Sequence, residues 1–291
     1  MITLFTTTKN FEGEFNIIQR NAISSWRAIS NDIEIIIIGQ SNGAEEVAGQ
    51  FNAKYINEVK CTLQGTPTIK GLFDVAETNS LNDILCYVNA DIILPKNFLE
   101  IIDILKIISQ NFMAVGYRWD LDIRELIDFQ NELISRKFWD NAIENAQKHA
   151  CTGIDYFFYR KGSINILSNI AIGRFGWDNW FLWKARRMRI PLIDLSKEFF
   201  IIHQNHSYNN DLLKDKDDIL KSQDGIENSK IIGDRILNLL DCTYILENGK
   251  IHRKNDRDFI QRYLHRLPKI FPEFSIPLTI YRRLYNWYKN Y

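Results

Sequence analysis

The sequence contains no apolar run of about 18 residues, the length that a helix needs to cross a bilayer. Its first residues lack the apolar core of a secretory signal peptide. There are only four cysteines, which lie far apart without a C-x-x-C pair, as is typical of reduced thiols in a cytosolic protein. From these absences we expect a cytoplasmic protein, at most peripheral at the inner face of the plasma membrane.

An excess of charge of one sign is missing as well. Over 291 residues, 36 Lys and Arg balance 36 Asp and Glu, so the net charge indicates no partner. The charge is uneven along the chain, because residues 250–291 carry ten basic and three acidic residues among several aromatic ones. Residues 278–288 predict a short amphipathic helix there, suited either to an anionic membrane surface or to packing on the domain. No nucleic-acid-binding module is recognisable, so we expect no nucleic acid partner.

Glycine-rich phosphate loops are also absent. No G-x-G-x-x-G follows an early strand, which argues against a dinucleotide oxidoreductase. The sequence does contain short apolar runs alternating with helical patterns, which is typical of a doubly wound α/β layout. Strands are predicted at residues 2–7, 34–38, 53–56, 84–88, 112–117, 154–160 and 199–203. Helices are predicted at residues 15–29, 44–51, 66–76, 96–109, 121–149 and 179–188, and residues 211–249 are polar and weakly helical.

One stretch places polar side chains where a strand ends. Residues 84–88 are apolar and β-branched or aromatic, as in a buried strand, and Asn89 and Asp91 follow. In open α/β sheets, ligands bind just beyond the carboxyl ends of strands. A carboxylate there can hold a divalent cation, which can neutralise a diphosphate. The alternative interpretation of these two residues is an Asx turn without a ligand.

Four segments follow one another along the chain: Thr6-Thr7-Thr8, Tyr87-Val88-Asn89-Ala90-Asp91, Gly176-Trp177-Asp178-Asn179-Trp180 and Ile202-His203-Gln204-Asn205-His206. In this order they resemble the GT-A-fold nucleotide-sugar glycosyltransferases of the family-2-like group, over roughly residues 1–210. The resemblance implies an α/β catalytic domain with a Rossmann-like mixed, mainly parallel sheet flanked by helices. Residues 211–291 would then be a C-terminal helical, basic and aromatic extension. The implied partners are a nucleotide-sugar donor and a glycan or lipid-linked acceptor.

The resemblance also implies a divalent cation, Mn²⁺ or Mg²⁺, at the end of the central strand. Members of the group have Asp-X-Asp there, whereas this chain has Asn89 first, which leaves Asp91 as the certain anion. A late histidine often completes the metal site in this fold. His203, at the end of a predicted strand, is the expected ligand, and imidazole suits Mn²⁺ better than Mg²⁺. His206 is expected to be a loop residue that does not bind the metal.

Asp178 is expected to be the general base of an inverting transfer, between two tryptophans that stack on a sugar. Its alternative role is that of a helix N-cap. By resemblance, donor-binding roles fall on Thr6, Thr7, Thr8, Gln40, Thr66, Lys70, Asn89, Asp91 and Arg118, with Asp120 and Asp122 near the donor sugar. Sugar or acceptor roles fall on Asp155, Arg174, Trp177 and Trp180.

Two rival functions stay open on the sequence. A sugar nucleotidyltransferase shares the α/β layout, but it needs a glycine-rich loop after the first strand, where this chain has Thr-Thr-Thr-Lys-Asn. A sugar-binding module without catalytic activity is the other rival, since Asn89 would then reflect lost metal binding.

Overall fold

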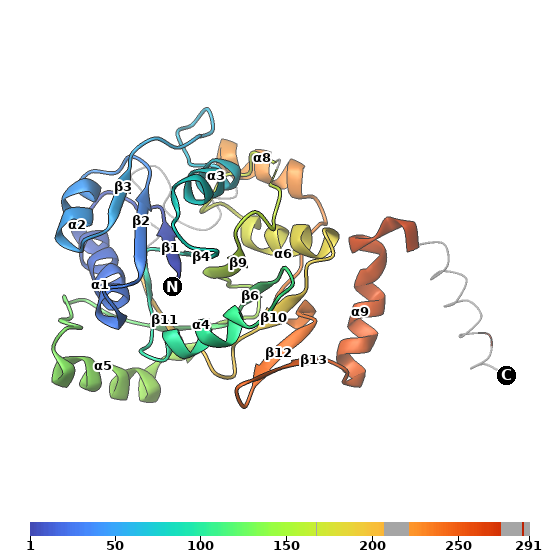
Figure 1. Cartoon of the computed structure of the whole chain (residues 1–291). Coiled ribbons are helices and arrows are strands. Elements are labelled where there is room, and N and C mark those ends of the chain that lie inside the picture. The colour runs from blue at the N-terminus through green and yellow to red at the C-terminus, as the bar shows by residue number, and fades with distance from the viewer. Residues whose placement is uncertain (167, 207–220, 275–286, 288–291) are drawn as a thin grey trace.

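A nine-stranded, mainly parallel sheet forms the centre of the protein (Figure 1). The computed structural model describes residues 1–166, 168–206, 221–274 and 287. The strand order is β13-β12-β10-β6-β9-β4-β1-β2-β3, with β9 and β13 antiparallel to their neighbours. The strands are β1 (Thr3–Thr6), β2 (Glu34–Ile38), β3 (Lys54–Ile56), β4 (Ile84–Val88), β6 (Met113–Val115), β9 (Tyr156–Arg160), β10 (Leu192–Asp194), β12 (Tyr244–Glu247) and β13 (Lys250–Arg253).

A second sheet of four strands follows the end of β4, in the order β5-β11-β7-β8. Its strands are β5 (Ile92–Ile93), β7 (Arg118–Leu121), β8 (Gln147–Lys148) and β11 (Ile201–Gln204). The β5 strand begins directly after Asp91 and pairs antiparallel with β11, where His203 is the partner of Ile92. This pairing brings His203 beside Asp91, although the two residues are far apart in the sequence.

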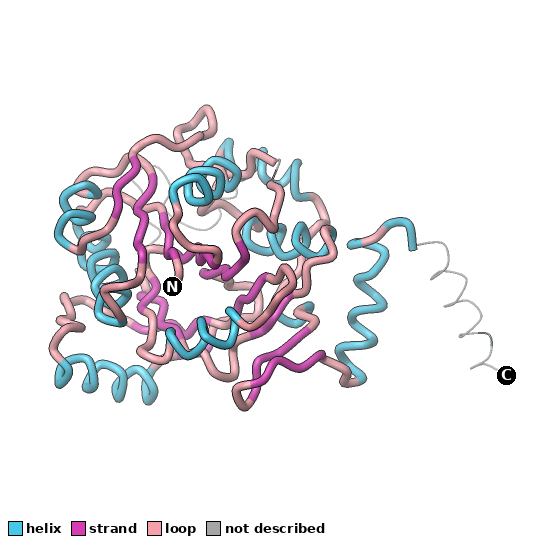
Figure 2. Tube along the Cα trace, viewed as in Figure 1, coloured by secondary structure: helices cyan, strands magenta, loops and turns pink. Residues whose placement is uncertain are grey.

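Helices cover both faces of the large sheet, as the cyan segments of Figure 2 show. Leu4 and Cys86 face the core shared with α1, α2 and α4, whereas Phe5 and Tyr87 face the core shared with α3, α6, α8 and α9. Because successive strand residues point to opposite faces, burial on both sides explains the continuous apolar runs of the inner strands. The helices are α1 (Gly13–Ile29), α2 (Ala44–Gln50), α3 (Ile69–Asn79), α4 (Phe98–Lys106), α5 (Glu132–Asn145), α6 (Trp177–Arg187), α8 (Gln223–Ile232) and α9 (Arg257–Ile270), with 3₁₀ turns η1 (Leu239–Asp241) and η2 (Pro272–Phe274).

The predicted strands are all present, but two predicted helices begin later than expected. The helix expected from residue 121 begins at Glu132, because the Asn131 side chain accepts hydrogen bonds from the following amides and caps the helix there. The helix expected from Thr66 begins at Ile69, because the Thr68 hydroxyl accepts the amide of Gly71. Capping side chains therefore decided both boundaries.

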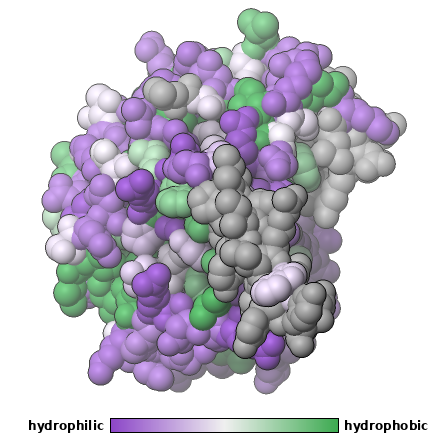
Figure 3. All heavy atoms as spheres, turned by 90° about the vertical axis from the view of Figure 1, so that its right-hand side faces the viewer, coloured by the Kyte–Doolittle hydropathy of each residue, from purple (hydrophilic) through white to green (hydrophobic). Residues whose placement is uncertain are grey.

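The C-terminal part is helical at α8 and α9, and it also adds the β12–β13 hairpin to the edge of the large sheet, which the sequence analysis did not predict. Pro268 does not end α9 but lies inside its last turn. The amphipathic helix expected over residues 278–288 lies outside the described residues, apart from Trp287. The face of the molecule in Figure 3 is mostly hydrophilic where described residues form it. In the described part of the chain, no helix combines the length and apolar character of a membrane span.

Candidate active site

A cavity of about 860 Å³ opens where β1, β2 and β4 end. These three strands are parallel neighbours, so their carboxyl ends meet at one edge of the sheet, where α/β proteins bind ligands. Residues shortly after each of the three strands line the cavity: Thr7 and Thr8 after β1, Gln40 and Ser41 after β2, and Asn89, Ala90 and Asp91 after β4.

Three side chains that suit a divalent cation meet in this cavity. Oδ2 of Asp91 lies 3.6 Å from Nε2 of His203 and 3.4 Å from Nε2 of His206, and one ligand atom from each residue lies within 4.8 Å of the others. The second carboxylate oxygen, Oδ1 of Asp91, is buried without a hydrogen-bond partner among the described residues. One carboxylate with a spare oxygen and two imidazoles form a donor set that fits a transition ion such as Mn²⁺.

The charges in this group stabilise one another. Burial alone would raise the pKa of the Asp91 carboxyl, but His203 and His206 hold that pKa well below its usual range. Burial also opposes protonation of His203, but the carboxylates of Asp91 and Asp120 outweigh it and raise the pKa of His203 to about 9. Because ligands must be deprotonated, a cation that enters the site displaces a proton from this imidazole.

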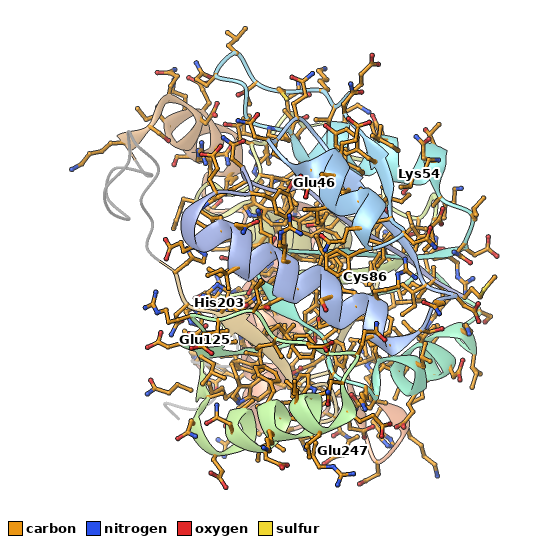
Figure 4. All side chains as sticks on the ribbon, turned by 90° about the vertical axis from the view of Figure 1, so that its left-hand side faces the viewer. Glu46, Lys54, Cys86, Glu125, His203 and Glu247 are labelled. Atoms are coloured by element: carbon orange, nitrogen blue, oxygen red, sulfur yellow. The ribbon has the colours of Figure 1, made fainter. Side chains whose placement is uncertain are left out.

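A second layer of polar groups orients His203. Its Nδ1 lies 3.0 Å from Oδ1 of Asp120, which is on β7, the strand paired with β11. The other oxygen of Asp120 lies 2.5 Å from Nδ1 of His149, and Nε of Arg118 lies 3.1 Å from Oδ1. Asp120 therefore bridges two histidines and directs Nε2 of His203 toward Asp91. Figure 4 shows His203 in the layer between α1 and α5.

The side chain of Asn89 bonds neighbouring protein groups through both its nitrogen and its oxygen. Its amide nitrogen donates to Oδ1 of Asp155 at 2.7 Å, and its carbonyl oxygen accepts from the Tyr87 hydroxyl at 2.7 Å. Asp155 is 5% exposed and also accepts from Nη1 of Arg118 at 3.1 and 2.9 Å. A carboxylate at position 89 would face the buried carboxylate of Asp155 at hydrogen-bond distance. This explains the departure from Asp-X-Asp in structural terms.

This architecture matches solved structures at low sequence identity. Residues 1–349 of S. aureus TarS, solved in complex with UDP-GlcNAc, match over 92% of this chain and 72% of that one, with 12% identity and a TM-score of 0.50. The chain has the GT-A fold. Another structure of S. aureus TarS matches with 13% identity and a TM-score of 0.50, over 92% of this chain and 43% of that one. M. tuberculosis glucosyl-3-phosphoglycerate synthase matches with 12% identity and a TM-score of 0.48, over 87% of each chain.

The sequence comparisons add no relative to these structures. No protein-family model and no curated protein sequence matches the chain. The GT-A fold is therefore established here by structure, and the roles of individual residues rest on the geometry of this chain.

Within the GT-A fold, Asp178 lies in the first turn of α6 and not at its N-cap, which is Gly176. The capping alternative is therefore wrong. Burial raises the pKa of the Asp178 carboxyl to about 7, and the negative charge of Asp155 contributes, against nearby backbone amides that lower it. Asp178 is not among the residues that line the cavity. Its side chain is partly exposed. Its charge acts on Asp155 and Tyr87, two residues that line the cavity, so Asp178 lies close to the lining.

Trp177 and Trp180 do not offer a face on which a sugar could stack, contrary to the expectation from sequence. The two side chains are 6% and 2% exposed, and Trp177 packs against Tyr87 and Phe157. Positions three apart share one side of a helix, and here that side of α6 faces the sheet. Both tryptophans belong to the core that supports Asp178.

Most of the other predicted site residues line the cavity, but some do not. Thr6 is fully buried in β1, and Lys70 pairs with Asp74 along α3. Asp122 accepts a hydrogen bond from Asn205. Those that the cavity brings together with Asp91 and His203 are Thr7, Thr8, Gln40, Thr66, Asn89, Arg118, Asp155 and Arg174.

Sequence reasoning missed His206 and Lys9, both of which line the cavity. His206 was expected to stay outside the site because it follows the strand end. The chain turns after β11, however, and returns the imidazole to Asp91, with the ring of Phe15 packed against it at 5.2 Å. The His-x-x-His spacing was the one signal in the sequence that could have indicated this ligand.

Proposed function

We propose that this chain is a nucleotide-sugar glycosyltransferase, which moves a sugar from a nucleotide-diphosphate donor to a hydroxyl group of a glycan or lipid-linked acceptor. The observation that carries the proposal is the meeting of Asp91, His203 and His206 at the end of β4, in the cavity of a GT-A fold. A site of this kind suits a donor whose leaving group is a diphosphate, because that group is best stabilised by a divalent cation.

The donor is expected to lie along the ends of β1, β2 and β4. Thr7, Thr8 and Gln40 offer hydroxyl and amide groups to a nucleoside, and the hydroxyls of Thr8 and Ser41 already bond each other at 2.6 Å. Because TarS was solved with UDP-GlcNAc, uridine diphosphate sugars are the first donors to test. The diphosphate would then point toward Asp91.

Asp91, His203 and His206 would hold the divalent cation, which when bound supplies positive charge to the departing diphosphate. Asp120 keeps the imidazole of His203 in the orientation that this role needs.

Asp178 is the proposed base. It takes the proton of the acceptor hydroxyl while that oxygen bonds to the anomeric carbon and the bond from this carbon to the diphosphate breaks, which inverts the configuration. A carboxyl with a pKa of about 7 is suited to this task near neutral pH.

The two rival functions receive less support. An inactive sugar-binding module was considered because Asn89 stands in place of an aspartate. The hydrogen bonds of Asn89 to Tyr87 and Asp155 explain that asparagine. The three side chains that could hold a metal are still together. The nucleotidyltransferase would need a glycine-rich loop after β1, and the chain has Thr7, Thr8 and Lys9 there.

We further propose that the C-terminal part holds the enzyme at an anionic membrane surface. Arg253, shortly before α9, and Arg257, in the first turn of α9, are exposed. Basic residues at a helix surface attract anionic lipid head groups. The tail after Phe274 adds further basic and aromatic residues in the sequence.

The function is tested by the thermal stability of the purified protein with nucleoside diphosphates and Mn²⁺. Uridine diphosphate with Mn²⁺ should raise the melting temperature, because a ligand that binds the folded state stabilises it. Asp91→Ala should remove this shift, whereas Asp103→Ala should keep it, since Asp103 is an exposed carboxylate on α4 that pairs with Lys106. If no nucleoside diphosphate stabilises the wild-type protein, or if Asp91→Ala responds fully, the proposed function is wrong.

A further inference from the structure

Two cationic side chains line the cavity without a carboxylate partner among the described residues. They are Lys9, in the loop after β1, and Arg174, in the segment before α6. Arg118, the third cation of the lining, is paired with Asp120 and Asp155. A positive side chain that is placed against a cavity and not neutralised by the protein is suited to an anionic ligand.

The position of Lys9 is set by α1. Its backbone amide donates to Oε1 of Gln19 at 2.7 Å, and its carbonyl accepts from Nε2 of the same residue at 3.0 Å. Gln19 is 3% exposed, so this pair of hydrogen bonds belongs to the buried framework of the fold. The ammonium group lies 3.9 Å from the ring centroid of Phe15, the residue that also packs on His206. Lys9 is therefore held at the side of the cavity where the ligand side chains meet.

Arg174 reaches the cavity from the segment before α6. Its Nη2 donates to the Thr66 hydroxyl at 3.2 Å, and that hydroxyl donates to Oδ2 of buried Asp224 at 2.5 Å. Nε of Arg174 is buried with no hydrogen-bond partner among the residues that the structure describes. The guanidinium therefore keeps hydrogen-bonding capacity that the described protein groups do not use, on a side chain that lines the cavity.

The two cations and Asp91 act on one another electrostatically. Burial lowers the pKa of Lys9, Asp91 raises it, and Arg174 lowers it. The three charges therefore lie around the same volume. Because Asn89 replaces a carboxylate at this edge, the lining there holds less negative charge than an Asp-X-Asp segment would supply.

We propose that Lys9 and Arg174 form a diphosphate clamp that binds the phosphates of the donor directly, without the divalent cation. This inference rests on the proposed function, since it assigns the two cations to the leaving group of the same donor. A guanidinium can meet two phosphate oxygens at once, and an ammonium acts as a compact point charge beside it. The clamp predicts that part of the diphosphate affinity survives complete removal of metal.

The test uses inorganic pyrophosphate, which carries the phosphate charge without a nucleoside, and titration calorimetry of the 291-residue chain in excess EDTA. Wild-type protein should bind pyrophosphate under these conditions. Lys9→Met and Arg174→Met should each weaken binding roughly tenfold, as expected for a lost hydrogen bond between charged groups, and the double variant should weaken it further. Lys9→Arg should retain most of the affinity. Lys197→Met and Arg187→Met are matched controls, because both side chains are exposed and paired with glutamates away from the cavity.

Binding of uridine diphosphate with Mn²⁺ is measured on the same proteins, with thermal unfolding as a check of folding. The clamp is refuted if wild-type protein fails to bind pyrophosphate in EDTA, or if the double variant binds it as wild type does. Metal-dependent binding of uridine diphosphate by wild-type protein would then still support the proposed function. If wild-type protein does not bind uridine diphosphate with Mn²⁺, that result counts against the proposed function itself.

Discussion

At the residue scale, hydrogen bonds decide which polar side chains at the end of β4 are available to a ligand. Asn89 donates to Asp155 and accepts from Tyr87, so its side chain is occupied on both sides. Asp91 has one buried oxygen without a partner and the other facing two imidazoles. Two residues that look equivalent in the sequence therefore have different roles, one in the wall of the cavity and one in the site.

Asn89→Asp tests this division. The new carboxylate would lie against Asp155 and would lose the bond that the amide donates, so we expect the free energy of unfolding to fall by about 1–3 kcal/mol. Mn²⁺ affinity should not increase, although the change restores Asp-X-Asp. Chemical denaturation and calorimetric Mn²⁺ titration measure the two quantities. Tighter Mn²⁺ binding with unchanged stability would mean that residue 89 reaches the cation.

Asp120→Asn tests the orientation of His203. Loss of an outer-shell carboxylate typically weakens metal affinity roughly 10–100-fold, and we expect that loss in a Mn²⁺ titration followed by electron paramagnetic resonance. Asp122→Asn is the matched control, because Asp122 lies on the same segment but accepts from Asn205. A purely structural role for Asp120 would lower the melting temperature and leave Mn²⁺ affinity unchanged.

Asp178→Asn tests the base and its pH dependence. Transfer should fall by roughly 10²–10⁴-fold while donor binding stays near wild type. In wild type, kcat/KM should rise with pH through about 7, because the base acts only when ionised. The raised pKa also means that wild type loses stability between its unfolded pKa of about 4 and about pH 7, because the unfolded chain ionises there while folded Asp178 stays protonated. The Asn variant should therefore gain stability relative to wild type as pH rises from about 4 to about 7, with the full gain above that range and little of it at about pH 4.

For this prediction, the measurements are initial rates over pH and thermal unfolding at both ends of the range. Near-normal transfer by Asp178→Asn would exclude the residue as base. A product that retains the anomeric configuration of the donor would exclude the inverting mechanism.

At the element scale, short pieces of backbone carry the site, and the elements around them hold those pieces in place. The segment that leads to Arg174 is fastened to α8 by Asn228, whose side chain makes two hydrogen bonds of 2.9 Å with the backbone of Ala171. Asn228 is 1% exposed. The helix α8 therefore acts as a support for the cavity wall and does not line it.

Asn228→Ala should leave the amide and the carbonyl of Ala171 buried without these partners. We expect the free energy of unfolding to fall by about 2–6 kcal/mol, since each of the two buried unpaired groups costs roughly 1–3 kcal/mol. Lys230→Ala is a control on the same helix, where Lys230 makes an exposed pair with Glu227. Denaturant unfolding measures both variants. Equal stability of the two would show that α8 does not hold the segment.

At the scale of the whole molecule, the chain after residue 250 is part of the folded body as far as the structure describes it. Arg262 pairs with buried Asp241 at 2.7 Å, and the Trp183 indole donates to the carbonyl of Lys269 at 2.9 Å. Ile270 is 2% exposed. These contacts fasten α9 to α6 and η1, which an anchor that is separate from the domain would not need.

Two truncations distinguish packing from membrane binding. Ending the chain after residue 258 removes the contacts of α9, and we expect a loss on the order of 5 kcal/mol because core side chains and a buried ion pair lose their partners. Ending it after Phe274 keeps those contacts, so the melting temperature should stay close to that of the full chain. In sedimentation with vesicles that contain anionic phospholipid, the chain that ends after Phe274 should bind more weakly than the untruncated chain. Unchanged vesicle binding would show that the residues after Phe274 do not anchor the protein to the membrane.

The sequence by itself determined seven of the strands, from β1 to β11, because apolar runs buried on both faces are visible in local composition. It did not indicate β5, β7, β8, β10, β12 or β13, and the order of the strands within the sheets came only from the tertiary structure. The sequence also placed Asn89 and Asp91 at the end of a strand, and that is where both lie. Only the tertiary structure decided that His206 lies beside Asp91 together with His203, and that Asn89 donates a hydrogen bond to Asp155. The same is true of the packing of Trp177 and Trp180 in the core. These outcomes depend on the pairing of β5 with β11, on the turn after β11 and on the side of α6 that meets the sheet. Local sequence cannot specify them, because each results from contacts between segments far apart in the chain.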